Sequence, residues 1–219
     1  MPSRLRPTAP IAADAVLVGD PGRALMLAQE LLEQPKMSNH ARGLWGYTGR
    51  TPAGSELSIQ ATGMGGPSAA LVLADLAELG VRRAIRVGTC TALDPELALG
   101  QLLAISEAHA WGSGGGGEPI LPDPRLSARL AAELGPAARP ATVASLDALH
   151  SGGGPAPVDA GDAADMQTAA VLRRGGELEV AIAAVLTVSI AAGGEQLGED
   201  DVEAAARRAG IAASAVLST

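Results

Sequence analysis

An arginine, Arg86, lies inside a short apolar segment at residues 84–87 that is typical of a buried strand. Burying a guanidinium there is unfavourable unless an anion pairs with it. Gly88 lets a ligand approach the backbone closely, and Thr89 offers a hydroxyl and an N–H group. The anion is either a phosphate or carboxylate ligand or a buried Asp or Glu of the same chain, and this segment alone favours neither.

A second arginine, Arg23, falls in the first turn of a helix predicted at residues 21–32. Asp20 is suited to cap that helix, with Pro21 at its first position. The exposed N–H groups of a helix N-terminus attract anions, so a cation there is unfavourable for the helix itself. Arg23 therefore suggests an anionic ligand, and a solvated surface arginine is the alternative.

A third arginine, Arg42, lies in a polar loop before a predicted hairpin, and its direction is not fixed by the pattern. Arg23 and Arg86 each follow or occupy a predicted strand. Together with Gly19 and Thr89, the three arginines would form a phosphate site of charge-assisted hydrogen bonds.

The elements that must position these residues alternate between strands and helices. Strands are predicted at 15–18, 84–87, 102–107, 141–145 and 180–188, and a hairpin at 47–50 and 55–61. Helices are predicted at 21–32, 124–134, 166–174 and 199–217, and a further helix opens from the glycine-rich turn at 62–68 and ends at 79. The Gly88–Thr89 pair is expected to close its strand in a turn. The pattern predicts a single-domain three-layer α/β/α sandwich with a mixed central sheet over residues 1–219.

Composition limits the function. The chain has 219 residues, a net charge of −8 and 47% hydrophobic residues, which disfavours general affinity for nucleic acid or anionic membranes. The single cysteine, Cys90, excludes an internal disulfide and favours a reducing cytoplasm. No signal peptide is visible, and the longest apolar run, at 180–194, is too short to span a bilayer comfortably.

Four motifs occur in a fixed order: GDPGRA at 19–24, ARG at 41–43 with GYTG at 46–49, TGMGGPS at 62–68, and IRVGTC at 85–90. In this order they resemble the nucleoside phosphorylase family that contains hexameric bacterial purine nucleoside phosphorylase and uridine phosphorylase. The resemblance runs from about residue 15 to residue 189, which is most of the chain.

The resemblance implies a pentosyltransferase that cleaves a ribonucleoside with phosphate to a free base and ribose 1-phosphate, purine nucleosides being favoured and uridine possible. It implies a homo-oligomer built from dimers, a hexamer, with inorganic phosphate as co-substrate and no metal or other cofactor. Arg86 and Arg23 would be the catalytic residues. The phosphate-binding residues would be Gly19, Arg23, Arg86 and Thr89, with Arg42 from a neighbouring subunit. The ribose would contact Met64, Met166 and Gln167. The base pocket would contain Cys90, Leu149, His150, Ser189 and Ile190.

The chain departs from the family pattern on the sugar and base sides. Gln167 replaces the glutamate that usually accepts hydrogen bonds from the ribose, and Ile190 replaces the aspartate that acts as general acid in purine enzymes. Leu149 and His150 align with a Phe-Tyr pair that packs on the base. The alternative function is therefore a catalytically impaired family member that binds phosphate or a nucleoside, and an unrelated α/β protein is a third, disfavoured possibility.

Overall fold

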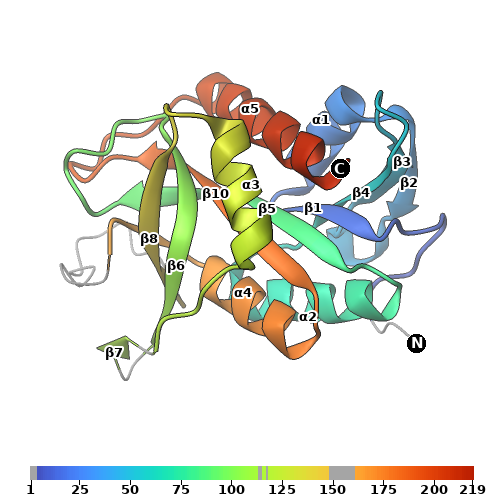
Figure 1. Ribbon diagram of the computed structural model, residues 1–219, viewed down its shortest axis with the longest axis horizontal. Helices are drawn as coiled ribbons and strands as arrows, with labels where there is room; N and C mark the ends of the chain where they lie inside the picture. Colours follow the sequence, from blue (N-terminus) through green and yellow to red (C-terminus); the bar gives the residue numbers. More distant parts are fainter. Residues whose placement is uncertain (1–3, 113–114, 117, 148–160) are drawn as a thin grey trace.

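The computed structural model describes residues 4–112, 115–116, 118–147 and 161–219. These residues form a mixed sheet covered by helices on both faces (Figure 1). The strands are β1 (Asp14–Val18), β2 (Glu33–Asn39), β3 (Gly46–Arg50), β4 (Glu56–Ala61), β5 (Arg83–Ala92), β6 (Leu102–Gly112), β7 (Gly115–Gly116), β8 (Arg139–Leu146), β9 (Ala163–Asp165) and β10 (Ala181–Ile190). The helices are α1 (Pro21–Leu31), α2 (Gly65–Glu78), α3 (Pro124–Leu134), α4 (Thr168–Glu177) and α5 (Glu199–Leu217), with a short 3₁₀ turn, η1 (Ala41–Gly43).

The sheet combines an open half with a closed ring. Along the described strands the order is β10-β6-β8-β9-β5-β1-β4-β3-β2, and β10 also pairs with β5, so the first five strands close on themselves. The four strands β4, β1, β5 and β10 lie side by side in this order, and each runs parallel to the next. The chain leaves β1 on one side to build β4 and returns through α2 to build β5 on the other. The carboxyl end of β1 is therefore a topological switch point, where α/β proteins bind ligands.

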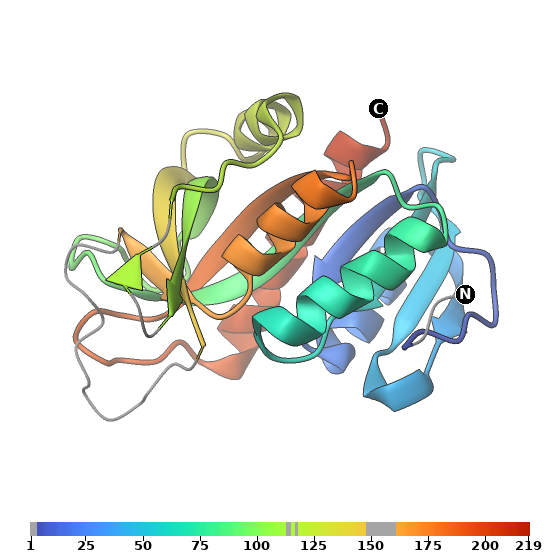
Figure 2. The same cartoon turned by 90° about the horizontal axis from the view of Figure 1, so that it is seen from below.

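Two apolar cores lie on the two faces of the sheet. One contains buried residues of α2 and α4, such as Leu73, Leu76 and Leu172. The other contains buried residues of α1, α3 and α5, such as Leu27 and Leu130. Figure 2 shows α2 and α4 side by side on one face, with the sheet behind them. This arrangement confirms the predicted three-layer sandwich with a mixed sheet.

One prediction about the strands was wrong, and strands β2, β7 and β9 were not predicted. Strand β5 does not end in a turn at Gly88 and Thr89, because β10 pairs with both residues. The strand continues to Ala92, and its last two residues pair with β9. The polar edge strand β2 was not predicted, since its sequence carries Pro35 and charged residues and it pairs only with β3 along its length. Within the described residues, no helix is long and apolar enough to cross a membrane.

Candidate active site

A cavity of about 390 Å³ opens at the carboxyl ends of β1 and β4, beside the middle of β5. Residues of the first turns of α1 and α2 line it, so the N-termini of two helices lie beside the same space. The lining residues are Gly19, Asp20, Pro21, Arg23, Gly63, Met64, Gly65, Arg86, Gly88, Thr89, Met166 and Gln167. The cavity thus brings together most of the predicted phosphate-side and ribose-side residues.

Arg23 enters the cavity from the first turn of α1. Asp20 caps this helix by accepting a hydrogen bond from the Arg23 backbone N–H at 2.8 Å. Among the described residues, the guanidinium of Arg23 has no hydrogen bond or ion pair of its own. Burial lowers the pKa of Arg23, nearby Asp20 raises it, and the positive charge of Arg86 lowers it further. A half-buried cation of this kind is a suitable partner for an anionic ligand.

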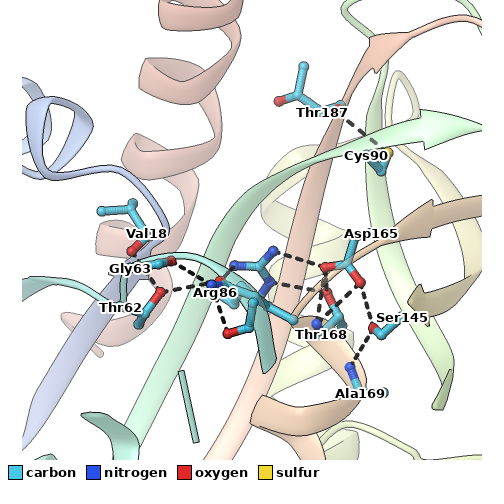
Figure 3. A network of polar contacts seen from close by, with 12 residues as sticks. Val18, Thr62, Gly63, Arg86, Cys90, Ser145, Asp165, Thr168, Ala169 and Thr187 are labelled. Carbon is cyan, nitrogen blue, oxygen red and sulfur yellow. Dashed lines mark hydrogen bonds and ion pairs between the residues drawn. The ribbon is translucent and has the colours of Figure 1, made fainter. Parts of the chain in front are cut away.

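Arg86 projects from β5 and is only 4% exposed. Its guanidinium donates to Asp165 Oδ2 at 2.9 Å and to Thr168 Oγ1 at 3.1 Å (Figure 3). It also donates to Gln167 Oε1 at 2.7 Å. The sequence left open whether Arg86 pairs with a ligand or with a buried Asp or Glu of the same chain. The structure shows that one partner is an internal carboxylate, that of Asp165. An arginine side chain has five N–H donors, so these contacts leave two without a partner among the described residues, and the side chain still lines the cavity.

Asp165 is the centre of the internal network. It accepts hydrogen bonds from the Ser145 hydroxyl at 2.5 Å and from the Thr168 hydroxyl at 2.6 Å, in addition to Arg86. Its carboxylate also accepts from the Thr168 backbone N–H at the start of α4. Asp165 thereby connects β9, β8 and α4 to the arginine of β5. Which carboxylate pairs with Arg86 could not be predicted from the sequence, because Asp165 and Arg86 lie 79 positions apart.

Gln167 lies between Arg86 and the glycine-rich turn before α2. Its Oε1 accepts from Arg86 and lies 3.2 Å from the Thr62 hydroxyl. Its Nε2 donates to the carbonyl oxygens of Gly63 at 2.6 Å and Gly65 at 3.3 Å. The side-chain amide of Gln167 is therefore engaged within the protein.

Of the remaining predicted phosphate-side and ribose-side residues, all but Arg42 line the cavity. Thr89 lines the cavity and is half-buried. Met64 is 84% exposed at the N-cap of α2, and Met166 lines the cavity from the β9–α4 connection. Arg42 is exposed and does not line the cavity of its own chain, and its φ of 60° lies in the left-handed region. A contribution of Arg42 from a neighbouring subunit stays a prediction.

The predicted base-side residues do not line this cavity. Cys90 is buried in the core, and burial, followed by the nearby charge of Asp165, raises the pKa of its thiol. Ser189 donates from its hydroxyl to the Cys90 carbonyl at 3.1 Å, and Ile190 is half-buried where the register of β10 shifts. Leu149 and His150 lie outside the described residues. The base-side assignments stay predictions.

No group of three or more His, Cys, Asp or Glu side chains is placed to hold a metal ion within the described ranges. The site is a cavity lined by two arginines and bordered by two helix N-termini, at the switch point of a mixed α/β sheet. Features of this kind are typical of α/β proteins that bind anionic small molecules. The sequence profile described as Phosphorylase superfamily matches residues 14–219, and the chain belongs to this family. The resemblance drawn from the four motifs is thus confirmed.

Similar proteins agree with this assignment. The chain is 44% identical over 88 residues to "Purine nucleoside phosphorylase DeoD-type" of Oceanobacillus iheyensis, a match that covers 40% of this chain and 37% of that protein. It is 39% identical over 99 residues to the protein of the same name from Caldanaerobacter subterraneus, covering 45% of this chain and 42% of that protein. The chain therefore matches about two fifths of the length of these curated relatives.

Solved structures share the fold. A purine nucleoside phosphorylase of Toxoplasma gondii in complex with immucillin-H has a TM-score of 0.82 at 21% identity, covering 94% of this chain and 91% of that one. A uridine phosphorylase of Phytophthora capsici has a TM-score of 0.87 at 21% identity, covering 98% of this chain and 92% of that one. At this level of identity, these structures establish the fold alone.

Proposed function

We propose that the protein is a nucleoside phosphorylase, which cleaves a ribonucleoside with inorganic phosphate to a free base and ribose 1-phosphate. Purine nucleosides are the favoured substrates and uridine is the second. The observation that carries this proposal is the half-buried Arg23, unpaired among the described residues and placed beside Arg86 in a cavity at the switch point of the sheet. The family membership and the similarity to purine nucleoside phosphorylases support it.

The cavity suits the chemistry of this reaction. Cleaving a glycosidic bond leaves oxocarbenium-like positive charge on the sugar. A phosphate held by Arg23 and the free N–H groups of Arg86, with Gly19 and Thr89 at its edge, would stabilise that charge and then attack the sugar carbon. Fixed arginines place the nucleophile and require no reorganisation during the reaction. Met64 and Met166 would provide the apolar wall of the sugar site.

The base side carries the unusual part of the proposal. The side chain of Ile190 has no proton to give, so it cannot protonate a leaving purine as a general acid does. We propose that the base leaves with help from backbone groups or water in a pocket that includes Cys90, Leu149, His150, Ser189 and Ile190. A single-domain organisation, a dimer-based hexamer with Arg42 shared between subunits, and a cytoplasmic location belong to the same proposal.

A catalytically impaired protein that binds phosphate or a nucleoside is the second candidate. The specific observation in its favour is that Arg86 donates hydrogen bonds to Gln167 and to Asp165, so Arg86 and Gln167 already have partners within the protein. Under this alternative the cavity would bind the anion without cleaving a nucleoside.

Phosphate-dependent release of free base from inosine, guanosine, adenosine, uridine and thymidine tests the proposal. Release of a base only when phosphate is present, with formation of ribose 1-phosphate, supports the enzyme. Phosphate binding without release supports the second candidate, and neither binding nor release refutes both.

A matched pair of variants locates the anion. Arg23 and Arg125 both lie in the first turn of a helix that begins with Asp-Pro, but Arg125 is exposed and outside the cavity. Arg23→Ala should remove phosphate binding, and Arg125→Ala should leave it unchanged. Equal behaviour of the two variants would place the anion elsewhere.

A further inference from the structure

The side chain of Gln167 is almost completely buried, at 4% exposure, although it lines the candidate sugar and phosphate cavity. Both hydrogens of its amide nitrogen have acceptors, the carbonyl oxygens of Gly63 and Gly65. Its oxygen accepts from Arg86 at 2.7 Å and also lies near the Thr62 hydroxyl, which is shared with the Val18 carbonyl at 2.9 Å. An amide has two donor hydrogens and one acceptor oxygen, so little capacity remains for a ligand.

The acceptors of the Gln167 amide nitrogen belong to the turn that starts α2. Gly63 and Gly65 both have positive φ, 72° and 80°, a conformation that favours glycine. This turn puts the N-terminus of α2 at the cavity, and nothing caps that helix through a side chain. Holding two of its carbonyl oxygens fixes the direction of the whole turn. The same side chain holds a guanidinium N–H of Arg86 on the other side of the cavity.

We infer that Gln167 is a positioning residue, which fixes the Gly63–Gly65 turn relative to Arg86, and that it does not read the sugar hydroxyls. The inference rests on the proposed function for its consequence, the geometry of the phosphate site, but its structural part is independent of turnover. It assigns to the amide a role that a carboxylate could not fill, because the carbonyl oxygens of Gly63 and Gly65 require donors.

Two substitutions separate the two roles. In Gln167→Glu, the carboxylate keeps acceptors for Arg86 but loses both donors and places negative charge against two carbonyl oxygens. A sugar-binding residue would improve in this variant, because an ionised acceptor forms stronger hydrogen bonds with hydroxyls. A positioning residue would fail, and so would Gln167→Met, which keeps the approximate shape and loses every hydrogen bond.

The experiment measures three quantities on the full chain for wild type, Gln167→Glu and Gln167→Met. They are hydrogen exchange of the backbone amides in residues 62–68, the Kd for inorganic phosphate, and the Kd for inosine. The control is Gln101→Glu, which makes the same amide-to-carboxylate change at a glutamine that accepts from the Ala98 N–H and lies outside this cavity.

The expected result is faster exchange in residues 62–68 and roughly tenfold or greater weakening of phosphate binding in both Gln167 variants, with no such change in the control. Unchanged exchange in Gln167→Glu, or tighter inosine binding with unchanged phosphate binding, would overturn the inference. If wild type binds no phosphate, the proposed function fails, and the exchange of residues 62–68 still decides the role of Gln167.

Discussion

Replacement of Arg86 by methionine removes one partner of a buried ion pair. Asp165 is 1% exposed, and in Arg86→Met its carboxylate would stay in the interior without a counter-charge. Breaking a buried pair in this way destabilises a protein by about 3–5 kcal/mol. The hydrogen bonds from Ser145 and Thr168 to Asp165 remain, so the lower end of this range, about 3 kcal/mol, is the appropriate estimate.

This loss of stability has a measurable size. For a chain of this length, each kcal/mol shifts the melting temperature by about 2–4 °C, so Arg86→Met should melt roughly 6–12 °C below wild type. The assay is thermal unfolding, together with urea unfolding to confirm that the change is in the free energy of unfolding. Arg125→Met, at an exposed arginine, is the control and should melt as wild type does.

The double variant tests the cause. Arg86→Met combined with Asp165→Asn removes both charges. The amide keeps one acceptor oxygen and offers its NH2 group to the hydroxyl that loses its acceptor, so the double variant should recover more than half of the lost stability. Such a recovery is a coupling energy, which a double-mutant cycle isolates. An unchanged melting temperature in Arg86→Met, or additive losses in the double variant, would refute the buried ion pair as a stabilising contact.

The single variant Asp165→Asn tests whether Arg86 contributes to phosphate binding. It leaves Arg86 buried without its carboxylate, while Arg86 still lines the anion site. Inorganic phosphate should therefore raise the melting temperature of Asp165→Asn by more than it raises that of Arg86→Met, since a ligand stabilises according to its affinity for the folded state. If phosphate raised the melting temperatures of both variants equally, Arg86 would not be part of the phosphate site.

Three other variants test separate parts of the proposal. If a missing acid alone limits purine cleavage, Ile190→Asp should raise kcat/KM for inosine by at least about 100-fold, and no gain would mean that more of the base pocket has diverged. Arg42→Gly should keep the melting temperature within about 3 °C, because glycine relieves the left-handed φ, while phosphate affinity falls; unchanged affinity would exclude Arg42. Burial raises the pKa of the Cys90 thiol, so its contribution to stability is complete below its ordinary pKa of 9.0 and is lost at higher pH. Melting temperatures of wild type and Cys90→Ala on either side of that pH should show this loss in wild type only.

Elements whose ends are set by local contacts were predictable from the sequence. Helix α3 begins and ends as predicted, because Asp123 caps it, Pro124 occupies its first position and Gly135 follows it with a φ of 71°. Strand β5 was predicted to end at residue 87, and it continues to Ala92 because neighbouring strands pair with it. Strand pairing depends on segments far away in the chain, so no local pattern contains it.

The candidate site divides in the same way. Gly19, Arg23 and Thr89 could be selected from their own motifs, and the structure brings them together at one cavity. The partner of Arg86 could not be selected, because Asp165 belongs to a short strand, β9, that the sequence did not predict. A buried arginine predicts that an anion pairs with it. Which anion pairs with Arg86 follows only from the strand order, which brings β9 and Asp165 beside β5.

The charges around the cavity argue for a contribution from a second subunit. Within one chain, Arg86 is paired with Asp165, and Arg23 lies near the charges of Asp20 and Glu203, so carboxylates already offset both arginines. The two helix N-termini add only partial positive charges, roughly half a charge each, whereas a phosphate dianion brings two negative charges. Arg42, exposed and held at a φ of 60°, is outside the cavity of its own chain. A cation contributed across a subunit contact would complete the balance, and Arg42→Gly tests this directly because it changes the charge and not the fold.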